Sequence, residues 1–205
     1  MGSLLICIQV SAQARSGMEN YHQVGEEQSY LWIPMVHYTA ASGFYAEMRY
    51  NYEDAATLSV FAGKSFTINK NRFSGNLVPM LGYSTGNFKG LSIALNSEFI
   101  LGTFFFSSQM QYSHALNADS RSFYFNWSET GFSLSDRIDA GLAVQYTLDS
   151  KGGDFEPGIV AGFNAGAFSF PVYLFRPFDK KQFIIAGLNY EFQLRSKKRS
   201  KGLAL

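Results

Sequence analysis

The chain of 205 residues holds little of what defines several common protein classes. Its one cysteine, Cys7, leaves no disulfide framework within the chain. Three scattered histidines beside it match no metal-ligand spacing. Only 16% of the residues are charged, against about 25% in an average soluble domain. These shortages exclude a highly charged disordered chain, and the sequence predicts no metal site and no cofactor.

Basic residues are also scarce outside the last stretch of the chain. The formal net charge is +1, from 17 basic and 16 acidic residues. Five of the basic ones lie in residues 195–205, which leaves 17 − 5 = 12 basic against 16 acidic residues elsewhere. A mildly acidic body with a basic C-terminal tail argues against a nucleic-acid partner.

Long apolar runs are absent as well. One of the longest, Phe99 to Phe106, is far shorter than the roughly 18–20 residues of a membrane-spanning helix. The mean hydropathy of −0.07 agrees with this. A transmembrane β-barrel stays open, because only half of the residues in each of its strands are apolar.

The N-terminus has the features of an export leader. Leu4 to Val10 forms a short apolar stretch, and Ala12-Gln13-Ala14 has the small-residue spacing of a cleavage site. We therefore predict a signal peptide over residues 1–14 and an N-terminal periplasmic segment over 15–28.

From residue 29 onward the dominant pattern is alternation with a period of two. In the segment from Gly43 to Glu53, Phe44, Met48 and Tyr50 share one face, while Glu47 and Arg49 lie on the other. Residues Asp136 to Leu148 and Gln182 to Gln193 repeat this pattern, which is typical of β-strands with two unlike faces.

About eleven such segments, joined by turn sequences, fill residues 29–194. Each is about ten residues long, which suits barrel strands better than the 5–6 residues of an average sandwich strand. We predict an all-β fold, an antiparallel up-and-down transmembrane β-barrel. Bacterial barrels have even strand numbers, so about twelve strands are expected, with ten as the alternative.

Aromatic residues make up 17% of the chain and gather toward strand ends. Tyrosine and tryptophan favour the membrane interface, where the ring is apolar and its polar atom stays hydrated. The predicted interface girdle comprises Tyr30, Trp32, Tyr38, Tyr50, Tyr52, Tyr112, Trp127, Tyr146, Tyr190 and Phe192.

The last strand carries a more specific pattern, Gly187-Leu188-Asn189-Tyr190-Glu191-Phe192. It resembles the closing-strand signal of bacterial outer-membrane barrels, which implies recognition by the barrel-assembly machinery. The whole chain resembles a small porin-like outer-membrane protein of Gram-negative bacteria. The segment Tyr45 to Glu53 and the run Trp127-Ser128-Glu129 are similar to small barrels of the Bacteroidetes type.

The apolar face of such a barrel meets the lipid bilayer, so the polar face lines the lumen. The predicted lumen-lining residues are Glu47, Arg49, Asn51, Glu98, Gln109, Arg137, Asp139, Glu156 and Glu191. They suit a pathway for small hydrophilic solutes, in which five acids against two bases favour cations. Equally, they suit a lumen that these side chains pair across and fill.

The third interpretation is a barrel with enzymatic activity. Ser113 and His114 are the one tempting pair for acyl chemistry. Neighbouring strand residues point to opposite faces, so the two side chains are not expected to meet. We therefore predict a non-enzymatic narrow porin in the outer membrane for small polar solutes, with a closed structural or partner-binding barrel as the alternative.

Overall fold

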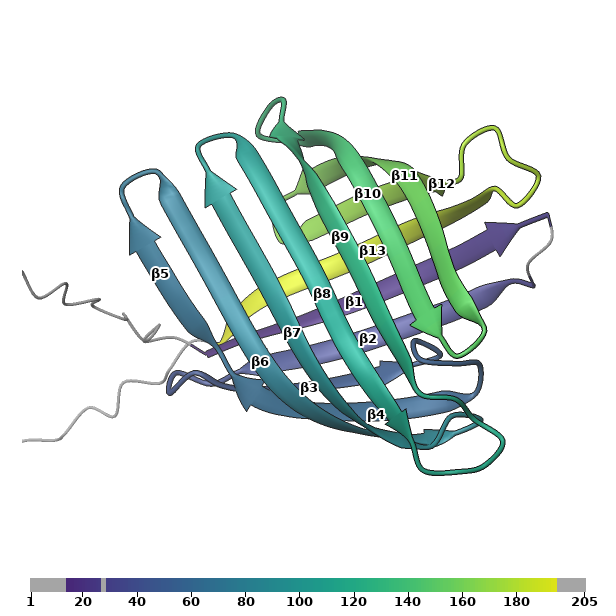
Figure 1. Cartoon of the computed structure of the whole chain (residues 1–205). Helices are drawn as coiled ribbons and strands as arrows, with labels where there is room; N and C mark the ends of the chain where they lie inside the picture. Colours follow the sequence, from purple (N-terminus) through teal and green to yellow (C-terminus); the bar gives the residue numbers. More distant parts are fainter. Residues whose placement is uncertain (1–13, 27–28, 195–205) are drawn as a thin grey trace, which may run out of the picture.

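A computed structural model describes residues 14–26 and 29–194, which form thirteen β-strands and no helix (Figure 1). The strands are β1 (Ala14–Gly25), β2 (Leu31–Thr39), β3 (Phe44–Tyr50), β4 (Thr57–Lys64), β5 (Phe66–Lys70), β6 (Phe73–Gly86), β7 (Gly90–Leu101), β8 (Phe104–Ala115), β9 (Phe123–Ser133), β10 (Ile138–Asp149), β11 (Gly152–Ala165), β12 (Phe168–Phe175) and β13 (Phe183–Leu194). Most of the predicted leader and the basic tail lie outside the described residues.

The strands form one antiparallel sheet that closes on itself. Neighbours in the chain pair with each other, β1 pairs with β13, and β4 pairs with β6. Gly63 opposes Met80 and Phe66 opposes Leu77, so β5 continues β4 in the same register against β6. The ring therefore has twelve positions, and the predicted up-and-down antiparallel barrel is confirmed.

Residues 15–28 were predicted to form a periplasmic segment. That prediction is wrong, because most of these residues belong to β1. This strand pairs along its length with β13, from Ala14 opposite Leu194 to Gly25 opposite Phe183. Its other edge pairs with β2. Since both edges need partners, β1 supplies the twelfth position that closes the ring.

The two ends of the barrel differ in their connections. At the terminal end, where β1 begins and β13 ends, the connections are residues 40–43, 71–72, 102–103, 134–137 and 166–167. At the loop end, they are residues 26–30, 51–56, 87–89, 116–122, 150–151 and 176–182. Short turns on one side and longer loops on the other are typical of outer-membrane barrels.

Alternation sorts the side chains between the lumen and the outer surface. In β3, Tyr45, Glu47 and Arg49 are buried inside, whereas Phe44 and Met48 are exposed outside. Large aliphatic and aromatic side chains cover the outer surface: Leu81, Leu142 and Phe155 are 69%, 62% and 62% exposed. No helix among the described residues is long and apolar enough to cross a membrane.

Small residues allow the inner face to pack closely in one sector of the ring. A Cβ on Gly82 of β6 would lie 2.3 Å from the ring of Phe61, which is buried on the neighbouring β4. Phe61 packs there in a cluster with Tyr45, Val78 and Met80. Glycine at position 82 thus gives this ring its place inside the barrel.

Candidate functional site in the lumen

Arg49 is the centre of a charged network inside the barrel. Its side chain is 1% exposed, and its Nε donates to Glu47 on the same strand. Its Nη1 donates to Gln111 Oε1 of β8 at 3.0 Å and lies 3.8 Å from Glu53 Oε1. The guanidinium also lies over the ring of Tyr52, 4.4 Å from its centroid. Such a buried charge is tolerated only because carboxylates and an amide surround it.

The connection between β3 and β4 folds into the lumen. The Tyr52 hydroxyl donates to Gln109 Oε1 of β8 at 2.6 Å, and its ring meets Phe125 of β9 edge-on. The Glu53 carboxylate accepts hydrogen bonds from Gln111, at 3.2 Å, and from Ser59. These contacts join one wall of the barrel to another, so the 51–56 connection narrows the lumen at the loop end.

Asn51, which was predicted to line the lumen, lies in this connection directly after the end of β3. Its φ is +59°, a left-handed conformation that asparagine tolerates better than most residues. Its amide donates to the Trp32 carbonyl at 2.8 Å, and its side-chain oxygen accepts from the Ala56 amide at 2.7 Å. Asn51 thereby holds Tyr52 and Glu53 in their inward position.

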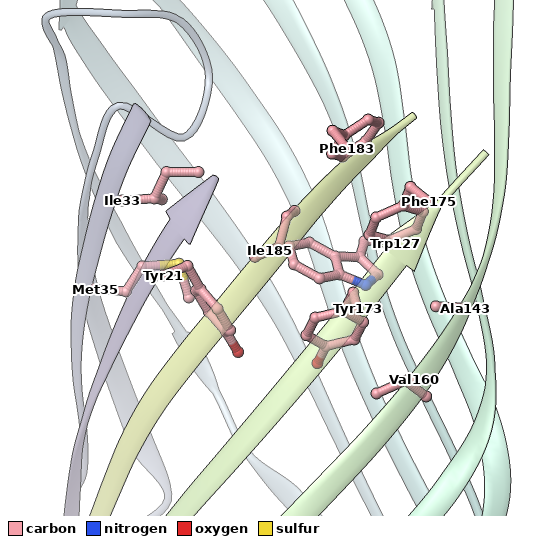
Figure 2. Packing of buried hydrophobic residues seen from close by; sticks show 10 residues of the cluster. All are labelled: Tyr21, Ile33, Met35, Trp127, Ala143, Val160, Tyr173, Phe175, Phe183 and Ile185. Carbon is pink, nitrogen blue, oxygen red and sulfur yellow. The ribbon is translucent and has the colours of Figure 1, made fainter. Parts of the chain in front are cut away.

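An aromatic cluster fills the lumen beside this network (Figure 2). Trp127 of β9 meets Tyr21 of β1 at 5.6 Å between ring centroids, and Tyr173 of β12 at 5.1 Å. Phe175 and Phe183 stack at 5.0 Å toward the loop end. Because β1 and β9 lie five positions apart in the ring of twelve, the contact between Tyr21 and Trp127 spans the lumen.

A small cavity remains next to these rings. Its volume is about 20 Å³, and its lining residues are Tyr21, Tyr52, Ser107, Gln109, Trp127 and Glu129. The Glu129 carboxylate accepts the Tyr173 hydroxyl at 2.9 Å. The Trp127 Nε1 group is buried and has no hydrogen-bond partner in the described part of the chain.

The terminal half of the lumen is more open and is lined by acids. His37 Nε2 lies 2.8 Å from Glu191 Oε1, and His37 Nδ1 lies 3.7 Å from Glu19 Oε1. Gly17 leaves room for this group, since a Cβ there would lie 2.3 Å from Glu191. The Glu191 side chain is 59% exposed, and Glu98 is also exposed.

Three other residues that were predicted to line the lumen lie outside the charged network around Arg49. Asp139 accepts a hydrogen bond from Asn164 at 2.5 Å, and Glu156 pairs with Arg176 at 3.2 Å toward the loop end. Arg137 lies in the turn before β10. Of the predicted lumen residues, the structure thus brings Glu47 and Arg49 into direct contact. Gln109 is connected to them through Tyr52.

Trp127 and Tyr52 were predicted for the interface girdle, and both are instead in the lumen. For Trp127 a signal was present in the sequence. Glu129 lies two residues further along the same strand, on the same face, and a carboxylate is unfavourable against lipid. The other members of the predicted girdle lie outside this cluster; among them Trp32 and Tyr112 are 44% and 46% exposed.

Sequence reasoning missed Glu19 and Tyr21 because β1 was not recognised as a strand. The tempting pair Ser113 and His114 points to opposite faces. Ser113 contacts Ser92 inside the barrel at 2.8 Å, and His114 contacts Ser122 at 3.3 Å on the exposed side. The described residues hold no group of three or more metal-type ligands.

Comparisons with solved structures give barrels of the same kind. A KdgM porin superposes with a TM-score of 0.61 at 11% identity, covering 86% of this chain and 99% of that one. A KdgM porin in complex with disordered oligogalacturonate gives 0.59 at 10% identity over 86% and 99% of the two chains. A NanC porin gives 0.53 at 7% identity over 87% and 100%. No protein-family model matches the chain, and no curated protein matches it.

Proposed function

We propose that the protein is a narrow outer-membrane channel for small hydrophilic solutes. The closed ring of twelve positions, with an apolar outer surface and a polar inner one, is the single observation that carries this proposal. An apolar outer surface suits a bilayer, and a closed ring leaves no unpaired strand edge in it. The similarity to KdgM and NanC porins supports this fold of barrel.

The orientation follows from the connections. The terminal end, with its short turns, faces the periplasm, and the loop end faces outward. A solute then meets the Arg49 network and the aromatic cluster before it reaches the open, acidic half of the lumen. The excess of carboxylates there favours cations and uncharged solutes over anions.

A closed structural barrel is the second candidate, and the lumen contacts favour it. Arg49, Tyr52 and Trp127 reach from wall to wall, and the cavity beside Tyr52 and Trp127 accommodates little more than a water molecule. In this case the barrel serves as a structural or binding component of the cell envelope, and its lumen side chains act as a core.

Conductance in planar bilayers distinguishes the two candidates. Heat-dependent gel mobility first establishes that the purified protein is a folded barrel. A channel gives discrete current steps whose size changes with the cation of the electrolyte. The absence of steps from the folded protein, at either voltage polarity, would overturn the channel proposal and leave the closed barrel.

A further inference from the structure

His37 and Glu191 contact each other across the first strand of the barrel. His37 of β2 and Glu191 of β13 both oppose Gly17 of β1, one from each side. Although β1 separates their strands, His37 Nε2 lies 2.8 Å from Glu191 Oε1. A Cβ on Gly17 would lie 2.3 Å from that oxygen and 2.4 Å from the imidazole Cε1 atom. Glycine at position 17 therefore leaves the space that the pair occupies.

A second carboxylate faces the other nitrogen of the imidazole ring. Glu19, two residues along β1 from Gly17, places its Oε1 atom 3.7 Å from His37 Nδ1. In a neutral histidine one ring nitrogen is an acceptor, whereas both nitrogens of the protonated ring are donors. Carboxylates on both sides therefore suit the protonated ring. Histidine is also the side chain whose charge ordinarily changes between about pH 5 and pH 8.

Strand β3 contributes the other groups that face His37 along this wall. The Tyr45 ring stacks on the imidazole with 6.0 Å between the ring centroids, and the Tyr45 hydroxyl donates to Glu47. Glu47 is in turn paired with Arg49 in the charged network. The charge of Glu47 is thus balanced on its own strand, and the carboxylates without such a partner beside His37 are Glu19 and Glu191.

These groups belong to a ring of charges around the open half of the lumen. Glu98 of β7 lies five positions from β1 in the ring of twelve strand positions, on the opposite wall. It interacts electrostatically with Glu191, Arg15 and His37. The Glu191 side chain is 59% exposed and Glu98 is also exposed, whereas the His37 side chain is 14% exposed. The carboxylates therefore face the solution in the lumen, and His37 lies behind them.

The protonation of His37 changes the net charge of this ring of charges. The three carboxylates of Glu19, Glu98 and Glu191 and the one guanidinium of Arg15 sum to −2 while His37 is neutral, and to −1 once it is protonated. A more negative pore wall favours cations more strongly over anions. Deprotonation of His37 as the pH rises should therefore increase the cation preference of the open half.

We infer that His37 is a pH-dependent selectivity switch in the open half of the lumen. Protonation of the ring lowers the preference of the channel for cations, and deprotonation raises it. The inference rests on the proposed channel function and names a regulation of that pathway. The contact across Gly17 carries it, because this contact places a titrating ring directly beside an exposed carboxylate of the lumen.

Reversal potentials in a KCl gradient test the switch in planar bilayers, between about pH 5.5 and pH 8.5. We expect the ratio of cation to anion permeability to rise about twofold over this range in the unmodified protein. His37→Gln keeps a side chain that can form hydrogen bonds but has no charge, so it should abolish the rise. The matched control is His114→Gln, since His114 lies on the exposed side of β8, and this variant should keep the rise.

Proton NMR follows the ring itself without requiring conduction. The chain has three histidines, so His22→Gln together with His114→Gln leaves His37 as the one reporter. The imidazole resonances should shift in one step, and the midpoint of this step should coincide with that of the permeability change. If heat-dependent gel mobility shows that His37→Gln does not fold, the comparison of the two midpoints still tests the switch.

The possible outcomes separate this inference from the channel proposal. A constant permeability ratio in a protein that conducts overturns the switch and leaves the channel. A rise that persists in His37→Gln also overturns the switch, because a carboxylate then titrates in place of the imidazole. Different midpoints in the two measurements have the same meaning. A folded protein that never conducts overturns the channel proposal, and the switch with it.

Discussion

The loop-end half of the lumen is packed, whereas the terminal half is open. In the loop-end half, Arg49 and Glu53 are almost fully buried, and Phe175 and Phe183 stack on each other in the aromatic cluster. In the terminal half, Glu98 and Glu191 are exposed. The same inward-facing positions of the ring therefore serve as a core in one half and as a hydrated wall in the other.

The difference shows that barrel size alone does not decide whether a lumen is filled. A ring of twelve positions is wider than the eight-stranded barrels that side chains fill directly. Here the 51–56 connection adds two further side chains, Tyr52 and Glu53, to the packed half. The connections at the terminal end are at most four residues long.

The largest effect is expected from removing the charge at the centre of the packed half. Arg49→Met leaves the carboxylates of Glu47 and Glu53 buried without their cation. The free energy of unfolding should fall by about 3–5 kcal/mol, measured by urea titration in micelles. The triple variant with Glu47→Gln and Glu53→Gln should recover much of this loss. Unchanged unfolding of Arg49→Met would show that the network is not a core.

Shortening a side chain that spans the lumen should make the packed half resemble the open one. Tyr52→Ala removes the ring and the hydrogen bond to Gln109. We expect single-channel conductance to rise about twofold or more, because resistance is set by the narrowest part of a pathway. The matched control is Tyr50→Ala, since Tyr50 is exposed on the outer face. Equal conductance in both variants would place the constriction elsewhere.

Close packing around Gly82 gives a smaller effect. Gly82→Ala places a methyl group against the buried Phe61 ring and should reduce stability by about 1–3 kcal/mol in the same urea titration. Gly162→Ala is the control, because a Cβ added at Gly162 would lie 3.6 Å from its nearest neighbour, the Cβ of Asp139. A loss of the same size in both variants would mean that backbone freedom, and not the contact with Phe61, determines the result.

The smallest effect concerns the charges of the open half. Glu98→Gln removes an exposed carboxylate from the lumen, and the reversal potential in a KCl gradient should move slightly toward zero as cation preference falls. The shift should shrink at high salt, since screening acts over about 8–10 Å at physiological ionic strength. Asp119→Asn, in a connection at the loop end, is the control. A larger shift from Asp119→Asn would place selectivity at the opposite end.

Alternation in the sequence was sufficient to predict most of the barrel strands and part of the lumen lining. The faces of β3 are as predicted, because Glu47 and Arg49 alternate with Phe44 and Met48. In β9 the bulky aromatic residues suggested the outer face, whereas Trp127 packs inside with the rest of the aromatic cluster. Size and aromaticity do not distinguish a lipid-facing ring from a lumen-filling one; the nearby charge of Glu129 does.

Two features depend on contacts between distant parts of the chain and were beyond sequence reasoning. The strand β1 lacks the expected alternation of apolar outer and polar inner residues, because the polar Asn20 and His22 lie outward and Tyr21 lies inward. Its place in the ring follows from its pairing with both β2 and β13. The inward fold of the 51–56 connection depends on Gln109 and Gln111, which are 57 and 58 residues away from Tyr52 and Glu53. Local patterns do not carry this information.

The pairing of β1 with β13 has a consequence for the covalent order of the chain. Ala14 opposes Leu194, so the first and last described strands lie side by side at the terminal end. A short linker between these positions, with new termini opened in the 116–122 connection, would give a circular permutant with the same neighbours around the ring. In such a molecule, β13 and β1 would be joined as an ordinary hairpin.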